Sequence, residues 1–370
     1  AREIRKLARA HHNIKVLTLC GGVSIGPQLG SLEHGAHIIV GTPGRILDHL
    51  RKNSLKLDQV QQLVLDEADR MLDMGFAEAV ETILGACEQR SQTLLFSATY
   101  PDEILRISAR YQRQPEQISV ESVHSDVDIT QHFYELADSK GKTAAVEKLL
   151  AAFAPRSAIL FCNTKQQCQD LAEHLQQKGI HALALNGDLE QKERDQVMVR
   201  FANKSCPLLI ATDVAARGID VKELDAVINV ELSHDPEVHV HRIGRTGRAG
   251  ESGLALSLVA PKELGRLNRL EDYLKSPLTL EPMPEAADHY RVEPEMVTLN
   301  IDGGKKDKLR PGDILGALTK EAGLNADEIG KIDIFTFAAY VAVKPGSAKA
   351  ALLHLQNGKL KGRKFRTRRL

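Results

Sequence analysis

The 370-residue sequence lacks long apolar runs and paired cysteines. None of its apolar runs approaches the roughly 18–20 residues that a membrane helix needs, and the chain opens without a signal-peptide pattern. Its five cysteines form neither a CxxC pair nor a zinc-like spacing with histidine. These absences predict reduced, buried thiols in a cytoplasmic protein that has no membrane association.

The sequence also lacks a net charge, but its charges are unevenly placed. From Glu293 to the end there are 15 Lys and Arg residues against 9 Asp and Glu, whereas the rest of the chain carries 34 basic and 40 acidic residues. This asymmetry predicts a basic C-terminal module that meets a polyanion.

Two regions alternate short apolar runs with helical stretches, the rhythm of parallel α/β sheets. The apolar runs span residues 14–22, 36–45, 62–69 and 92–99, and then 157–164, 180–188, 207–220, 226–232 and 253–260. A polar link at 121–128 and a proline-containing link with Pro277, Pro282, Pro284 and Pro294 separate the regions. We therefore expect domains at 1–121, 129–275 and 293–370.

The last region follows a βαββαβ plan, as in an RNA-recognition module, which predicts an α+β fold. Two groups of cations are expected to bind RNA there: Lys305, Lys306, Lys308 and Arg310, which cluster on one turn, and the closing segment that includes Lys359 and Lys361. A solvated face is the alternative interpretation of such a charge run. Tyr340 occupies one expected stacking position of the sheet, but Ala338 occupies the other, so we expect binding through basic loops and edges.

The stretch VLDEADRMLDMGF begins at Val64 and places carboxylates directly after an apolar run. Asp66 at a strand end can hold Mg²⁺, directly or through water, and Glu67 can polarise an attacking water. The alternative is an acidic helix start, because carboxylates also favour helix N-termini.

Four further stretches carry candidate chemistry. HRIGRTGRAG, residues 241–250, spaces three arginines three apart among glycines, which predicts a rigid cationic turn. Such a turn suits charge stabilisation during phosphoryl transfer, and the alternative is an exposed basic loop that binds some other anion. GTPGR, 41–45, ends a strand and opens a helix, where amide donors and Arg45 would suit a phosphate or form an ordinary turn. ATDVAARGID, 211–220, ends another strand in polar residues, and SAT, 97–99, alone indicates a helix cap.

Together and in this order, these motifs closely resemble the DEAD-box family of RNA-dependent ATPases over about the first 275 residues. The resemblance implies two tandem RecA-like domains, ATP and Mg²⁺ as cofactors, and helicase activity on RNA. It assigns Mg²⁺ to Asp66, water activation to Glu67 and arginine fingers to Arg245 and Arg248. It further implies coupling by Asp69, Ser97, Thr99 and His241, ribose contact by Asp220, and RNA contact by Gly21, Gly22, Thr42, Arg45, Arg194, Thr212 and Gly218.

The basic stretch at residues 301–318 resembles the DbpA branch of this family. That resemblance implies docking on a hairpin of 23S ribosomal RNA and a role in assembly of the large ribosomal subunit, on pre-50S particles. A monomer is expected.

The phosphate-binding pattern GxxxxGK[ST] is absent from this sequence. The one GKT, Gly141–Thr143, has Leu136 where the first glycine should stand, so we interpret it as a helix start. In the family this loop lies upstream of the residues matched here, so we expect a truncated first domain and a chain that neither binds nor hydrolyses ATP appreciably. The alternatives are a non-catalytic RNA-binding protein that keeps the second lobe and the basic module, and, more weakly, a DNA helicase.

Overall fold

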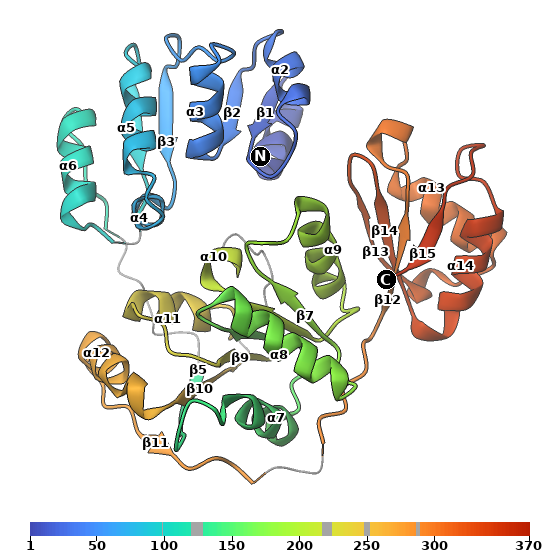
Figure 1. Ribbon diagram of the computed structural model, residues 1–370. Helices are drawn as coiled ribbons and strands as arrows, with labels where there is room; N and C mark the ends of the chain where they lie inside the picture. Colours follow the sequence, from blue (N-terminus) through green and yellow to red (C-terminus); the bar gives the residue numbers. More distant parts are fainter. Residues whose placement is uncertain (98, 120–128, 217–223, 248–251, 286–288) are drawn as a thin grey trace. The chain divides into compact units, whose positions relative to one another are not determined.

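The computed structural model describes residues 1–97, 99–119, 129–216, 224–247, 252–285 and 289–370 (Figure 1). They belong to two compact units, which divide at residue 122. The predicted polar link at 121–128 lies outside the described residues. Among the helices that are described, every one is too short or too polar to cross a membrane.

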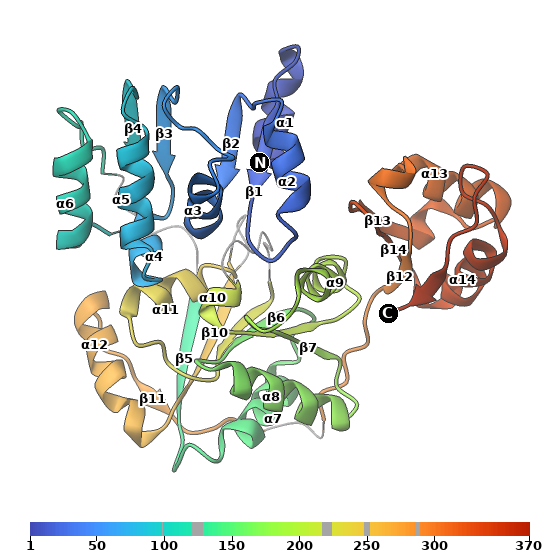
Figure 2. The same ribbon diagram turned by 45° about the horizontal axis from the view of Figure 1, so that its top comes forward.

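The first unit alternates strands and helices, as its sequence predicts (Figure 2). The elements are α1 (Arg2–Leu7), η1 (Ala8–Ala10), β1 (Val16–Leu19), α2 (Gly26–Leu32), β2 (Ile38–Gly41), α3 (Pro43–Arg51), β3 (Gln62–Leu65), α4 (Ala68–Asp73), α5 (Ala77–Ala86), β4 (Gln92–Leu95) and α6 (Asp102–Tyr111). β1 pairs with β2 and β3 pairs with β4, both in parallel. Leu63 and Leu65 face the core of this unit, whereas Val64 between them is 54% exposed. One face of β3 is therefore packed and the other is open.

The second unit contains a seven-stranded parallel sheet in the order β11-β5-β10-β9-β6-β8-β7. Its elements are β5 (Ile129–Glu135), α7 (Lys142–Phe153), β6 (Ala158–Phe161), α8 (Lys165–Gln177), β7 (Ala182–Leu185), α9 (Gln191–Ala202), β8 (Leu208–Ala211), α10 (Asp213–Ala216), β9 (Ala226–Asn229), α11 (Pro236–Ile243), β10 (Gly253–Val259), η2 (Pro261–Glu263), α12 (Leu264–Leu274) and β11 (Leu280–Glu281). Alternate residues of β6 enter two different cores, Leu160 one and Phe161 the other. Every residue of β6, β8 and β9 is buried, as in a parallel sheet with both faces covered.

The proline-containing link is packed along this sheet. β11 pairs in parallel with β5, and the Glu281 carboxylate lies 2.9 Å from His132 Nδ1. Tyr290 is buried and its hydroxyl donates to the Pro155 carbonyl at 2.8 Å. The described part of the link is thus attached to the sheet, and β11 is a strand that was not expected from the sequence.

The predicted βαββαβ module follows at the end of the chain. Its elements are β12 (Val297–Ile301), η3 (Lys305–Asp307), α13 (Pro311–Gly316), η4 (Ala317–Glu321), η5 (Ala326–Glu328), β13 (Ile329–Ile334), β14 (Ala339–Val343), η6 (Pro345–Ser347), α14 (Ala348–Asn357) and β15 (Thr367–Arg369). The sheet is antiparallel in the order β13-β14-β12-β15. Leu299 and Val341 face a core shared with Ile314 of α13 and Leu355 of α14, so both helices cover one face of this sheet.

The opposite face of this sheet contacts the end of α9 and the loop after it. Asn203 Nδ2 donates to Thr298 Oγ1 at 2.9 Å, and the Thr298 hydroxyl donates to Ser205 Oγ at 2.8 Å. Tyr340 of β14, which is 2% exposed, packs with Val199 of α9. The position that an RNA-recognition sheet would use for base stacking is therefore filled by packing within the second unit.

Candidate RNA and nucleotide sites

The carboxylates Asp66 and Glu67 lie at the carboxyl end of β3, as predicted, and both are exposed. Glu67 precedes α4 with φ 52° and ψ 50°, a left-handed conformation that is uncommon for residues other than glycine. Phe96 fixes this turn on both sides: its amide donates to the Leu65 carbonyl at 2.8 Å, and its carbonyl accepts from the Ala68 amide at 3.0 Å. The end of β4 therefore holds two accessible carboxylates in a strained turn.

Asp69, Ser97 and Thr99, which the sequence analysis grouped, are connected by hydrogen bonds. Asp69 is 5% exposed, and its Oδ2 accepts from both the amide and the hydroxyl of Thr99, each at 3.3 Å. Ser97 Oγ accepts from the Asp69 amide at 3.1 Å and donates to the Thr99 carbonyl at 2.6 Å. The network ties the start of α4 to the segment after β4.

Arg45 supports the loop that contains Gly21 and Gly22. Its guanidinium donates to Gln28 Oε1 and to the Val23 carbonyl, both at 2.9 Å, and its side chain is only 11% exposed. Gln28 Oε1 also lies 2.9 Å from Nε2 of the fully buried His49, whose pKa is lowered chiefly by burial and then by Arg45. This bracing role could not be predicted from the sequence, because Gln28 and His49 belong to no recognised motif.

Thr42 precedes α3 in extended conformation, at the exposed end of β2. The glycine before it is required by packing: a Cβ on Gly41 would lie 2.9 Å from the Leu19 carbonyl oxygen and 2.7 Å from the Ile46 side chain. The turn from β2 to α3 is therefore set by a close backbone approach between β1 and β2.

In the second unit, Arg194 and Thr212 meet at α10. The Arg194 guanidinium donates to the Ala215 carbonyl, and burial lowers its pKa. Thr212 is 8% exposed, and its hydroxyl accepts from the Ala215 amide at 3.4 Å. Gly218 and Asp220 lie outside the described residues.

Arg242 and Arg245 of HRIGRTGRAG differ in position, which corrects the prediction of a single cationic turn for these two residues. Arg242 lies inside α11, is 2% exposed, and forms two bonds to Asp213, with Nε at 2.6 Å from Oδ1 and Nη2 at 2.8 Å from Oδ2. It also donates to Asn163, Asn229 and the Glu231 carbonyl. Arg242 therefore joins the 211–220 and 241–250 motifs internally.

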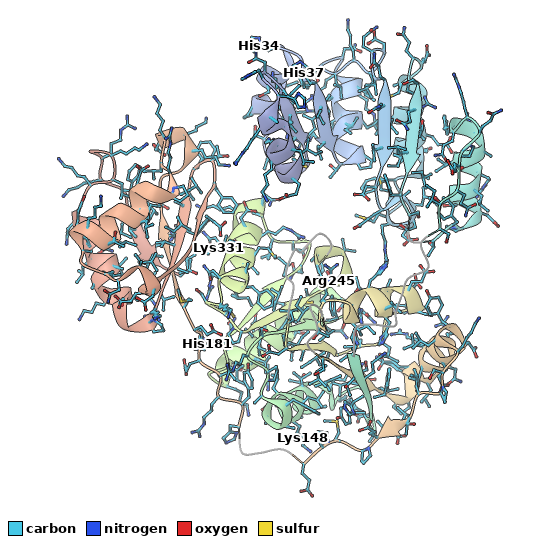
Figure 3. The ribbon with its side chains drawn as sticks, turned by 180° about the vertical axis from the view of Figure 1, so that it is seen from behind. His34, His37, Lys148, His181, Arg245 and Lys331 are labelled. Atoms are coloured by element: carbon cyan, nitrogen blue, oxygen red, sulfur yellow. The ribbon has the colours of Figure 1, made fainter. Side chains whose placement is uncertain are left out.

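The remaining site residues of this motif are His241, Arg245 and Arg248. His241 is exposed on α11, and Arg245 lies just beyond the helix, two residues after its end at Ile243 (Figure 3). Arg248 lies outside the described residues.

Lys142 of the GKT stretch begins α7, which confirms its interpretation as a helix start. Its Nζ lies 2.6 Å from Glu263 Oε2 and 3.8 Å from Glu231 Oε1, and the side chain is 8% exposed. Burial lowers the pKa of Lys142, while the bond to Glu263 acts in the opposite direction. This lysine is thus ion-paired with glutamates inside the second unit.

The two predicted groups of cations in the last module lie on adjoining loops. The members Lys305, Lys306, Lys308, Arg310, Lys359 and Lys361 are all exposed. Lys361 Nζ donates to the Lys308 carbonyl at 2.7 Å and lies 3.3 Å from Asp313. The fold therefore gathers basic residues that are about 50 positions apart in sequence, which spacing alone did not show.

Comparison with known proteins covers the chain almost from end to end. Residues 1–107 match the DEAD/DEAH box helicase family, residues 141–250 match the helicase conserved C-terminal domain, and residues 298–369 match the DbpA RNA binding domain. The ATP-dependent RNA helicase DbpA of Escherichia coli is 52% identical over 370 residues, which are 100% of this chain and 81% of that protein.

More distant relatives have the same helicase regions. A DEAD-box ATP-dependent RNA helicase CshA of Geobacillus kaustophilus is 42% identical over 286 residues, 76% of this chain and 61% of that protein. Saccharomyces cerevisiae Dbp5 bound to RNA and ADP BeF3 superimposes with a TM-score of 0.66 at 28% identity, covering 76% of this chain and 73% of that one. The motifs, the parallel sheets and these matches agree: the chain belongs to the DEAD-box ATP-dependent RNA helicases and is similar to DbpA along its whole length.

Proposed function

We propose that this helicase remodels 23S ribosomal RNA during assembly of the large ribosomal subunit, as a cytoplasmic monomer that acts on pre-50S particles. The match of residues 298–369 to a DbpA RNA binding domain carries this proposal. The exposed cations on the loops near Lys308 and Lys361 support it, because cations on adjoining loops suit the closely spaced phosphates of folded RNA. The functional modules are assigned to residues 1–121, 129–275 and 293–370.

We assign the chemistry of the first unit to the end of β3. Asp66 offers exposed carboxylate oxygens, the ligand type that Mg²⁺ prefers, and would hold the ion through water. Bound Mg²⁺ would neutralise charge on the transferring phosphoryl group. Glu67 would orient and deprotonate the attacking water. The bonded group Asp69, Ser97 and Thr99 would report nucleotide state, and His241 would share this role.

The remaining roles fall on motifs of both units. Arg245 and Arg248 would stabilise charge on the phosphoryl group, and Asp220 would contact the ribose. The residues proposed to contact RNA are Gly21, Gly22, Thr42, Arg45, Arg194, Thr212 and Gly218 in the helicase units, and Lys305, Lys306, Lys308, Arg310, Lys359 and Lys361 in the last module. Arg45 and Arg194 would act in part by holding loops, since each already donates to a backbone carbonyl.

Removal of residues 293–370 tests the RNA specificity. We expect the unaltered chain to prefer a fragment of 23S ribosomal RNA to a 16S fragment of equal length, and the shortened chain to bind both equally weakly. The measurement is competition binding at fixed salt, because phosphate contacts make affinity depend on salt. A shortened chain that still prefers the 23S fragment would refute the assignment of specificity to the last module.

Glu67→Gln tests the proposed water activation. The variant is compared with the unaltered sequence after a segment carrying GxxxxGK[ST] has been joined ahead of Ala1. We expect the amide to keep ATP and RNA binding but to lose nearly all turnover, because it cannot accept a proton from water. Undiminished RNA-stimulated hydrolysis would remove Glu67 from this role.

A further inference from the structure

Phe337 is an exposed aromatic side chain in the RNA-binding-type module. Of the four aromatic residues between 293 and 370, Tyr340 is buried, Phe335 and Phe365 are partly buried, and Phe337 is 66% exposed. It lies between β13 and β14, where those strands are joined. An isolated exposed apolar residue needs no explanation by itself, so the surroundings of Phe337 decide its significance.

The loop that carries Phe337 is fastened to the basic turn η3. The Lys305 amide donates to the Phe335 carbonyl at 2.8 Å, and the Lys306 amide donates to the Thr336 carbonyl at 3.1 Å. A third bond closes the loop itself, from the Phe335 amide to the Ala338 carbonyl at 2.8 Å. Phe337 is therefore held at a fixed place beside two lysines.

Gly304 makes this close approach possible. A Cβ at that position would lie 2.4 Å from the Phe335 carbonyl oxygen and 2.8 Å from the Ala338 amide nitrogen. Both neighbours are backbone atoms, so any side chain at 304 would push the two loops apart. The sequence therefore maintains the contact between the aromatic loop and the basic turn.

Lys306 lies against the ring of Phe337. Its Nζ is 4.7 Å from the ring centroid, within the range of a cation–π contact. With a cation on one side and a largely exposed ring, the remaining ring surface is accessible to a flat partner. An aromatic face with adjacent cations is the arrangement that binds unpaired nucleotides, because the base stacks while the phosphates meet positive charge.

We propose that Phe337 stacks on an unpaired RNA base, while Lys305 and Lys306 contact the flanking phosphates. The inference rests on the proposed binding of RNA by the last module and adds a specific preference for RNA with unpaired bases. It also moves aromatic recognition away from the sheet face, where Tyr340 is packed, to the β13–β14 loop.

Binding of two labelled RNAs tests the proposal: a hairpin with a single-stranded adenosine extension, and a blunt duplex with the same stem. In the full chain, Phe337→Ala should weaken binding of the extended RNA by about fivefold to a hundredfold, the range of base–aromatic stacking, and leave duplex binding nearly unchanged. Lys306→Gln should weaken both RNAs and reduce the salt dependence, which Phe337→Ala should preserve. Circular dichroism checks that each variant is folded.

A fluorescence measurement gives a second readout, because the sequence contains no tryptophan. Phe337→Trp should keep the affinity for the extended RNA, and its emission should be quenched on binding. Leu353→Trp is the matched control, since Leu353 is 49% exposed on α14 of the same module, and its emission should not respond.

Unchanged RNA binding by the Phe337→Ala variant, or equal losses of affinity for both RNAs, would overturn this inference alone. Failure of the unaltered chain to bind either RNA would overturn the proposed function as well.

Discussion

The two parallel-sheet regions of this chain have the same α/β rhythm but support their motifs differently. In the first unit, Val64 and Phe96 on β3 and after β4 are 54% and 55% exposed. In the second unit, every residue of the central strands β6, β8 and β9 is buried. The candidate carboxylates Asp66 and Glu67 thus follow a strand, β3, that has one solvent-exposed face. In the second unit, the motifs at 211–220 and 241–250 are held together by hydrogen bonds of the buried Arg242 guanidinium. Motifs at strand ends are therefore positioned by an exposed turn in the first unit and by a buried hydrogen-bond network in the second.

Replacement of Arg242 should have the largest effect. Arg242→Ala leaves Asp213 without its two guanidinium bonds and empties a buried site, so we expect a loss of about 3–5 kcal/mol in the free energy of unfolding of the second unit. Chemical denaturation measures the loss. Arg269→Ala on the exposed surface of α12 is the control and should cost less than about 0.5 kcal/mol. Equal losses for the two variants would show that the hydrogen bonds of Arg242 contribute little to the stability of the second unit.

A matched valine substitution compares the two sheets directly. Val227→Ala in β9 removes two fully buried methyl groups and should destabilise the second unit by about 2 kcal/mol. Val64→Ala in β3 removes methyl groups that are already half in water and should cost about 0.5 kcal/mol or less. Hydrogen exchange of the amides in each strand assigns each loss to its own unit. Similar costs would contradict the contrast between the sheets.

The stability of the second unit should fall in acid because of His239. This side chain is 1% exposed, and burial, with Arg242 as a smaller cause, lowers its pKa from 6.5 to about 3. The unfolded chain binds a proton at His239 more readily than the folded chain does. The stability that depends on neutral His239 is therefore fully present above pH 6.5 and is lost as the pH falls toward 3. The slope is at most about 1.4 kcal/mol per pH unit. Denaturation at several pH values should show it, and His239→Gln should flatten it.

A smaller effect is expected in the first unit. Ser97→Ala removes the hydroxyl that accepts from the Asp69 amide and donates to the Thr99 carbonyl, and it should cost about 1 kcal/mol. Hydrogen exchange at the ends of β3 and β4 is the measurement. Ser91→Ala removes an exposed bond to the Gln61 carbonyl and serves as control, with a smaller expected loss. Faster exchange in the control would contradict the importance of the Asp69 network.

The sequence predicts those elements whose pattern is local. β6 and β8 are continuous apolar runs, and β9 is apolar up to Asn229; a buried parallel strand produces that pattern. β5, with the sequence ITQHFYE, was not predicted because its polar residues Gln131 and His132 are stabilised by His239 and Glu281, which lie far along the chain. Pairing with β10 over its whole length, not its own composition, makes this segment a strand.

In the candidate sites, too, local patterns were predictable from the sequence and long-range contacts were not. The acidic strand end follows from the apolar run before it, whereas the grouping of Asp69 with Ser97 and Thr99 was implied by the resemblance to the DEAD-box family. The spacing did not distinguish Arg242 from Arg245, because that depends on α11 ending at Ile243, which leaves Arg242 within the helix and Arg245 beyond it. The expected stacking positions were those of Tyr340 and Ala338. Phe337 was not among them, because its significance depends on the contact of its loop with Lys305 and Lys306.

The most direct test of the account is to crosslink the protein to RNA in living cells and to sequence both partners of each crosslink. The account predicts that fragments of 23S ribosomal RNA predominate, and that the peptides from residues 293–370 come mainly from the loops around Lys305–Lys308, Phe337 and Lys359–Lys361. Crosslinks dominated by other RNAs, or spread evenly over the chain with none in these loops, would contradict it.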